Sequence, residues 1–114
     1  MGTSKPETEL VRQIRDYLHL RGAITTRVNS GLHVVGDGTD FRRVFRGAEK
    51  GTSDIIGCYR GRYFAIEAKV GKNKPTPEQE IFLESVRQAG GIAFAAWSLE
   101  DVDAGMNWEP YRTS

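Results

Sequence analysis

The stretch SDIIGCYRGRYFAIEAK, residues 53–69, decides the fold, because two apolar runs flank a short basic turn within it. The runs Ile55–Tyr59 and Tyr63–Val70 contain β-branched and aromatic residues, which is typical of strands. The segment between them is short enough for antiparallel pairing. We therefore predict a β-hairpin that is interrupted near its open end by two carboxylates and an ammonium group.

The three charged side chains of this hairpin, Asp54, Glu67 and Lys69, are predicted to meet at one end of it. Side chains alternate between faces along a strand, so Glu67 and Lys69 share a face, and hairpin pairing brings Asp54 opposite them. Two neighbouring carboxylates repel each other, and keeping both ionised in a partly dry site is costly unless a cation shares them. Magnesium prefers oxygen ligands, usually one or two carboxylates with a carbonyl and waters. We therefore predict a Mg²⁺ (or Mn²⁺) site held by Asp54, Glu67 and the backbone carbonyl of Ala68.

A metal at this position favours phosphodiester hydrolysis as the reaction class. A divalent cation can hold a scissile phosphate, lower the pKa of a bound water and neutralise charge on the phosphorus oxygens. Lys69 beside it can orient or deprotonate that water, or stabilise the transition state. The alternative is an exposed Glu–Lys pair on an edge strand, with Asp54 capping a turn.

The remaining pattern alternates helices and strands around this hairpin. The predicted elements are a helix at Pro6–Leu20 ended by Gly22, a strand at Ala23–Val28, two short strands at Leu32–Val35 and Phe41–Phe45, a helix at Pro77–Gln88 capped by Thr76, a strand at Ile92–Trp97 and a short helix beginning at Ser98–Asp101. We predict an α/β fold in which a mixed sheet is flanked by helices.

Two further polar side chains are predicted to point toward the sheet from the helices. Glu7 stands one turn before Leu10 and Val11 on the apolar stripe of the first helix, so we expect it to face inward. Gln79 lies on the same stripe of the second helix as Val86, so it also points at the sheet.

Size and composition favour one soluble domain. With 114 residues, of which 39% are hydrophobic, the chain can bury one core and is too short for two, so residues 1–114 are predicted to be a single domain. The apolar runs are too short to span a membrane, and the N-terminus lacks the apolar stretch of a signal peptide. We expect no membrane partner and a cytoplasmic location. The lone Cys58 is expected to be a buried thiol, and the scarcity of soft ligands predicts a hard cation for any metal site.

Charge is unevenly distributed along the chain. The net charge of the whole chain is +1. Residues 42–74 carry nine basic and three acidic side chains, whereas residues 75–114 carry two basic and seven acidic ones. A polyanion attracted to the basic middle would lie near the predicted metal site. The alternative is a solvated face of ordinary arginines and lysines.

Five ordered motifs resemble those of a known nuclease family. They are RVNSG at Arg27–Gly31, GTSDII at Gly51–Ile56, IEAK at Ile66–Lys69, PTPEQ at Pro75–Gln79 and GG at Gly90–Gly91. In this order they resemble the PD-(D/E)xK nuclease superfamily, and more closely its VRR-NUC branch, over about residues 6–103. Ser53 stands where the superfamily's named motif has proline, a position that this branch varies freely.

The resemblance implies roles for a set of residues. They are metal ligands at Asp54 and Glu67, a catalytic lysine at Lys69, and supporting roles for Glu7 and Gln79. Stand-alone domains of this kind resemble Holliday junction resolvases and are associated with phages and mobile elements, which implies a bacterial or phage-infected host cell. Because symmetric cutting of a junction needs two active sites, the resemblance also implies a homodimer.

Contacts with nucleic acid are predicted in and around the basic middle of the chain. The candidates are Arg27, Asn29, Ser30, Arg42, Arg43, Arg46, Lys50 and Lys72. Turn formation explains Asn29 and Ser30 nearly as well. We therefore expect a Mg²⁺- or Mn²⁺-dependent DNA endonuclease that prefers branched DNA such as a Holliday junction. The alternatives are a repair- or restriction-type duplex nuclease, and a non-catalytic DNA-binding domain with a vestigial site.

Overall fold

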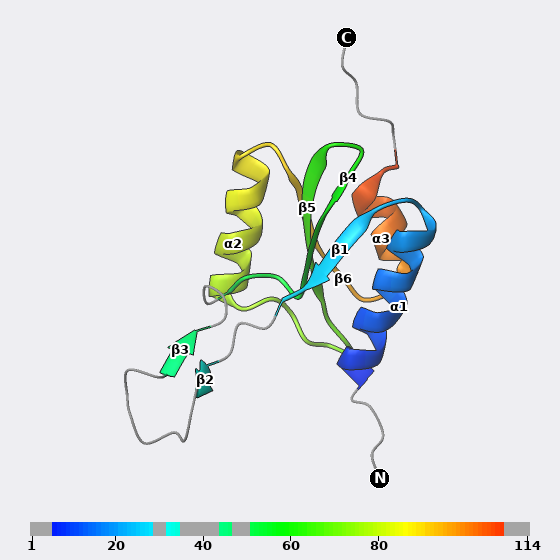
Figure 1. Cartoon of the computed structure of the whole chain (residues 1–114). Coiled ribbons are helices and arrows are strands. Elements are labelled where there is room, and N and C mark those ends of the chain that lie inside the picture. Colours follow the sequence, from blue (N-terminus) through cyan, green and yellow to red (C-terminus); the bar gives the residue numbers. More distant parts are fainter. Residues whose placement is uncertain (1–5, 29–31, 35–43, 47–50, 109–114) are drawn as a thin grey trace.

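A computed structural model of the chain describes residues 6–28, 32–34, 44–46 and 51–108. Its elements, drawn in Figure 1, are α1 (Pro6–Leu20), β1 (Ile24–Arg27), β2 (Leu32–Val34), β3 (Val44–Arg46), β4 (Ile55–Tyr59), β5 (Arg62–Ala68), α2 (Pro77–Gln88), β6 (Ile92–Ala96) and α3 (Leu99–Met106). The first two helices begin and end where the sequence predicts. The strands of the central sheet differ from the predicted ranges by up to two residues, and the predicted ranges 32–35 and 41–45 lie partly outside the described residues.

The central sheet has four strands in the order β1-β4-β5-β6. β4 is antiparallel to both β1 and β5, whereas β5 and β6 are parallel, so the sheet is mixed as predicted. The turn of the β4–β5 hairpin places Arg60 at φ 51° and Gly61 at φ 83°, a pair of positive values typical of a two-residue hairpin turn. β2 and β3 form a separate antiparallel pair.

Helices cover both faces of this sheet. Figure 1 shows α2 on one side and α1 with α3 on the other. The larger core joins residues such as Ile14 of α1 and Val102 of α3 to Phe64 and Ile66 of β5, all fully buried. Leu83 of α2 packs in a smaller cluster on the opposite face. β5 is therefore buried from both sides, and a charged residue on it cannot reach bulk water except at the end of the sheet.

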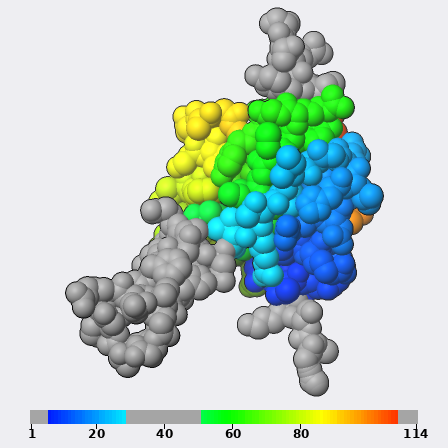
Figure 2. All heavy atoms as spheres, in the orientation of Figure 1, coloured from blue at the N-terminus to red at the C-terminus, as the bar shows by residue number. Residues whose placement is uncertain are grey.

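The prediction that Cys58 is buried is wrong, because its side chain is exposed. Cys58 pairs with Ile24 on β1 and Tyr63 on β5, which are themselves 72% and 45% exposed. α2 packs on β5 and β6, so the β1 side of this face stays open. Figure 2 shows β1 and the β4–β5 hairpin side by side on the surface next to α2.

Among the helices of the described ranges, none combines the length and the apolar character that a bilayer-spanning segment needs.

Candidate metal centre

Three carboxylates from different parts of the chain meet at one end of the sheet. Glu7 lies in the first turn of α1, Asp54 directly precedes β4, and Glu67 lies near the end of β5. Ile55 pairs with Ile66, so Asp54 stands one step further along the hairpin, opposite Glu67. An oxygen atom from each of the three carboxylates lies within 4.8 Å of the other two. The predicted meeting of Asp54 and Glu67 is therefore observed, and Glu7 joins them.

This donor set suits one hard divalent cation. Carboxylate oxygens are the ligands that Mg²⁺ and Mn²⁺ prefer in proteins. Two oxygens bound to one Mg²⁺ at about 2.1 Å each lie at most about 4.2 Å apart. The three carboxylates are thus close to a binding arrangement, and small side-chain rotations would complete it.

Glu67 is the most deeply buried of the three, with 1% of the residue exposed. Its Oε2 atom accepts a hydrogen bond of 2.9 Å from Gln79 Nε2 and lies 3.6 Å from Lys69 Nζ. Its Oε1 atom is buried and has no hydrogen-bond partner among the described residues. A buried carboxylate oxygen without a partner is costly. A cation bound at Oε1 would remove that cost, so the residues present fit a metal ion.

The site perturbs the acidities of its carboxyl groups. Burial, reinforced by the charge of Asp54, raises the pKa of Glu67 to about 8, although the Lys69 ammonium opposes the shift. Burial also raises the pKa of Asp54. A hydrogen bond of 3.0 Å, which the Ala68 N–H donates to Asp54 Oδ2, lowers this pKa and partly offsets the effect of burial. The charge of Glu7 raises the pKa of Asp54 further. Without a cation, the cluster therefore tends to hold a proton near neutral pH.

Gln79 connects the start of α2 to the acidic cluster. Its backbone N–H donates to Thr76 Oγ1 at 3.2 Å, and its side-chain Oε1 accepts from the Thr76 N–H at 2.8 Å. This capping box uses the oxygen of the amide and leaves Nε2 to donate to Glu67. A glutamate at this position could cap the helix but could not donate a hydrogen bond to Glu67.

Gly51 fixes the segment that leads to Asp54. Its φ of +89° lies in the left-handed region, and an added Cβ would lie 2.5 Å from the backbone oxygen of Glu78 in the first turn of α2. On the other side, the Val28 N–H donates a hydrogen bond of 2.8 Å to the Asp54 carbonyl. The Asp54 backbone is thus held between α2 and the end of β1. Gly51 was predicted from the sequence to belong to a motif, but its contact with α2 was not predicted.

The other predicted site residues are the catalytic lysine Lys69, the supporting residue Glu7 and the metal ligand Ala68. Lys69 follows the last residue of β5 and is 9% exposed, and its N–H donates to the Ala96 carbonyl at 3.0 Å. Glu7 was predicted to face inward, but it is exposed, because the first turn of α1 extends past the end of the sheet. Its carboxylate nevertheless reaches the cluster. The role of the Ala68 carbonyl as a metal ligand stays a prediction.

The predicted contacts with nucleic acid are only partly described. Arg27 ends β1 and Lys72 follows β5, and both are exposed. Arg46 lies at the end of β3. The other candidates lie outside the described residues: Asn29, Ser30, Arg42, Arg43 and Lys50.

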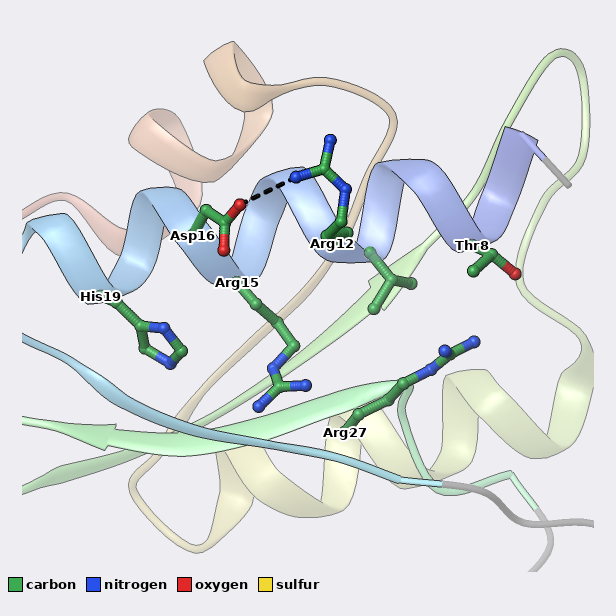
Figure 3. Close-up of a pocket in the computed structure, with 7 residues that line it drawn as sticks. Thr8, Arg12, Arg15, Asp16, His19 and Arg27 are labelled. Carbon is green, nitrogen blue, oxygen red and sulfur yellow. Dashed lines mark hydrogen bonds and ion pairs between the residues drawn. The ribbon is translucent and has the colours of Figure 1, made fainter. Parts of the chain in front are cut away.

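A cavity of about 360 Å³ between α1 and β1 was not anticipated from the sequence. Six of its lining residues are labelled in Figure 3: Thr8, Arg12, Arg15, Asp16, His19 and Arg27. The α1 residues Thr8, Arg12, Arg15 and His19 recur every three or four positions, which is the spacing of one helix face. That spacing could have shown that these four residues share one face of the helix, but it does not reveal that β1 lies across from this face.

Comparison with known proteins identifies a structural relative. No protein-family model matches the sequence, and no curated protein sequence matches it significantly. Among solved structures, the fold is similar to Hjc, a Holliday junction resolvase from the archaeal hyperthermophile Archaeoglobus fulgidus, with a TM-score of 0.53. The sequences are 21% identical, and the match covers 78% of this chain and 65% of the Hjc chain. At this level of identity, the likeness concerns the fold.

The likeness defines the class of fold. The four-stranded mixed sheet flanked by helices has the fold of that resolvase. The predicted fold class, a mixed sheet flanked by helices, is confirmed, whereas membership of the PD-(D/E)xK superfamily and of its VRR-NUC branch stays a prediction.

Proposed function

We propose that this protein is a divalent-cation-dependent endonuclease that hydrolyses phosphodiester bonds in DNA. The observation that carries the proposal is the convergence of Glu7, Asp54 and Glu67 within 4.8 Å, beside the ammonium of Lys69. The likeness of the fold to a Holliday junction resolvase supports the same class of reaction. A bound Mg²⁺ or Mn²⁺ would supply Lewis-acid chemistry and positive charge for the phosphate oxygens.

The carboxylates hold the cation in this proposal. Asp54 and Glu67 would be the principal ligands, and Glu7 would provide a third carboxylate oxygen. The hydrogen bond from Gln79 to Glu67 Oε2 restrains the Glu67 side chain, and Oε1, which has no hydrogen-bond partner among the described residues, stays available to a cation. Fixed outer contacts of this kind orient metal ligands and increase their affinity.

Lys69 acts on the water and the phosphate. Its Nζ atom lies 3.6 Å from Glu67 Oε2, and its backbone is anchored to β6 by the hydrogen bond to Ala96. From this position the ammonium can donate hydrogen bonds to the attacking water and to a phosphoryl oxygen. It thereby stabilises the negative charge that develops in the transition state.

The preferred substrate in this proposal is branched DNA, such as a Holliday junction. The support is the resemblance of the ordered motifs to the VRR-NUC branch, together with the resolvase-like fold. Symmetric cutting of a junction requires two sites, so we also propose a two-fold homodimer. The same resemblance favours the cytoplasm of a bacterial or phage-infected cell as the place of action.

Cleavage assays with a substrate panel test the function. Labelled four-way junction, flap and linear duplex would be incubated with Mg²⁺, with Mn²⁺ and with EDTA. We expect metal-dependent products, formed fastest from the junction, and a loss of at least about 100-fold in rate for Lys69→Met. Lys74→Met is the matched control, because it removes an exposed lysine from the same loop and should leave the rate within about twofold.

Three results would contradict the nuclease proposal. Equal cleavage in EDTA, or a Lys69→Met variant as fast as Lys74→Met, would exclude this site as the catalyst. Salt-sensitive DNA binding without any metal-dependent product would instead support the non-catalytic alternative. Equal rates on junction and linear duplex would favour a general duplex nuclease.

A further inference from the structure

Two arginines from different elements line the cavity between α1 and β1. Figure 3 shows the guanidinium groups of Arg15, from α1, and Arg27, from β1, directed into the space between the helix and the strand. Among the described residues, neither guanidinium forms an ion pair with a carboxylate. Two guanidinium groups without a carboxylate partner give this cavity a positive potential, which attracts anions. The arrangement therefore favours an anionic ligand in the cavity.

The position of Arg15 is fixed in advance of binding. Its Nε atom donates a hydrogen bond of 3.0 Å to Thr25 Oγ1, and the same hydroxyl lies 2.7 Å from His19 Nε2. The hydrogen bond uses the Nε–H, which leaves the two terminal NH₂ groups of the guanidinium for a ligand. A cation held in place before binding loses less conformational entropy when it binds.

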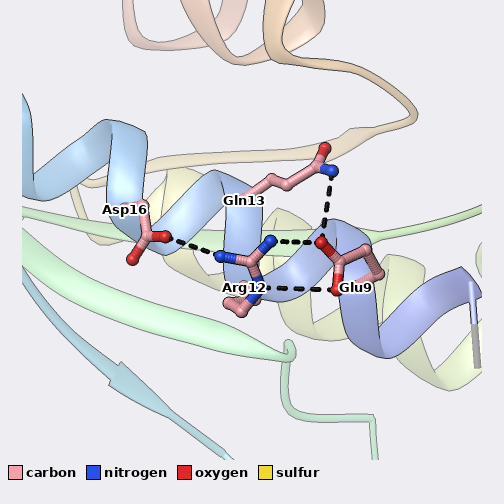
Figure 4. Close-up of polar contacts among 4 residues, drawn as sticks. All are labelled: Glu9, Arg12, Gln13 and Asp16. Atoms are coloured by element: carbon pink, nitrogen blue, oxygen red, sulfur yellow. Dashed lines mark hydrogen bonds and ion pairs between the residues drawn. The ribbon is translucent and has the colours of Figure 1, made fainter. Parts of the chain in front are cut away.

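Arg12, by contrast, is already neutralised on the outer side of α1. Figure 4 shows its guanidinium between Glu9 and Asp16, with both of which it forms ion pairs. Gln13 adds a hydrogen bond to the same Glu9 carboxylate. Arg12 thus lies at the rim of the cavity with its charge neutralised, and the unpaired positive charge comes from Arg15 and Arg27.

The cavity begins beside the metal centre. Thr8 directly follows Glu7, and Arg27 pairs with Ile55, the neighbour of Asp54. From there the cavity follows α1 as far as His19, eleven residues along the helix, which corresponds to about 16 Å. This distance equals about five base-pair steps measured along the axis of B-form DNA.

We propose that the α1–β1 cavity binds backbone phosphodiester groups of the DNA strand next to the scissile phosphate, gripped by Arg15 and Arg27. Guanidinium groups bind phosphate oxygens in paired hydrogen bonds, which suits two arginines on opposite walls. The inference rests on the proposed function for the identity of the ligand. It assigns a binding role to Arg15, which lies outside every motif of the sequence.

Binding is measured without cleavage, in EDTA, by the fluorescence anisotropy of labelled duplex and four-way junction at several salt concentrations. The variants are Arg15→Gln, Arg15→Lys and the control Arg62→Gln. Arg62 is exposed and lies on the β4–β5 hairpin, at the opposite end of β5 from the acidic cluster. Arg62→Gln removes the same charge without touching the cavity.

We expect Arg15→Gln to raise the Kd for DNA about tenfold, and to lower the slope of log K against log salt by about 1. Arg15→Lys should recover part of the loss, since it restores the charge but not the paired hydrogen bonds. Arg62→Gln should stay within about twofold of the wild type. Melting temperatures of all variants verify that each is folded.

The outcomes separate this inference from the proposed function. If Arg15→Gln and Arg62→Gln bind DNA equally well with equal salt slopes, the cavity is not a phosphodiester site, even when cleavage is normal. If Arg15→Gln weakens binding while the wild type cleaves no substrate, the cavity inference holds and the nuclease proposal fails. Displacement of labelled DNA by inorganic phosphate as readily as by unlabelled DNA would overturn the assignment to a DNA strand.

Discussion

Replacing Glu67 by glutamine should change how the stability of the metal-free protein depends on pH. Glu67 is 1% exposed, and burial raises its pKa from 4.5 to about 8. Between these values, the folded protein keeps a proton that the unfolded chain has released. The contribution of the protonated Glu67 to the free energy of unfolding is therefore complete below pH 4.5, falls as the pH rises from there, and is lost once the pH passes 8.

The size of the effect follows from the width of this window. At about 1.4 kcal/mol per pH unit, the interval from 4.5 to about 8 gives a loss of at most about 5 kcal/mol. The raised pKa of Asp54 acts in the same direction. Because small domains have unfolding free energies of about 5–15 kcal/mol, the wild type in EDTA should be markedly less stable at pH 8 than at pH 5.

Glu67→Gln removes the ionisation and keeps an oxygen that can accept the hydrogen bond from Gln79. In EDTA the variant should lose much less stability between pH 5 and pH 8, and at pH 8 it should be the more stable protein by about 2–4 kcal/mol. Urea unfolding followed by tryptophan fluorescence measures the free energy of unfolding of both proteins at pH 5 and at pH 8. Glu84→Gln is the control, since Glu84 is an exposed glutamate on α2. Parallel pH profiles for the wild type and Glu67→Gln would refute the reasoning.

Three further predictions concern the metal and the framework around it. At pH 8, Mn²⁺ at 100 times its Kd should stabilise the wild type by about 2.7 kcal/mol in urea unfolding, whereas Asp54→Asn should show little of this gain. Gly51→Ala should lower the free energy of unfolding by about 2–4 kcal/mol, because its Cβ would lie 2.5 Å from a backbone oxygen. Gly61→Ala, whose Cβ would have nothing within 4 Å, should lower it by about 1 kcal/mol. Equal losses for the two variants would exclude the packing explanation. Gln79→Ala should weaken Mn²⁺ binding in calorimetry about tenfold or more, since Glu67 loses the donor that restrains it; unchanged affinity would exclude that role.

Elements of local origin were predictable from the sequence. The run from Pro77 to Gln88 carries its own start signal, because Thr76 and Gln79 cap each other whatever lies nearby. The β4–β5 hairpin follows from two apolar runs and a short turn, and its register then places Asp54 opposite Glu67. These features depend on neighbours along the chain, so the sequence is sufficient to infer them.

Exposure was less predictable, because it depends on which helix covers which part of a sheet. Cys58 lies in an apolar strand, yet it is exposed, since α2 packs over β5 and β6. Glu7 lies on an apolar stripe, yet it is exposed at the end of α1. The single-domain prediction for residues 1–114 stays a prediction.

By itself, the sequence determined the helices, the strands and the pair of acids at the open end of the β4–β5 hairpin, because strand and helix periodicities and hairpin pairing are local properties. Only the tertiary structure brought the Glu7 carboxylate within 4.8 Å of the other two and placed Arg15 and Arg27 along the same cavity. It also raised the pKa of Glu67 to about 8, since desolvation is the combined effect of every element that excludes water from a side chain.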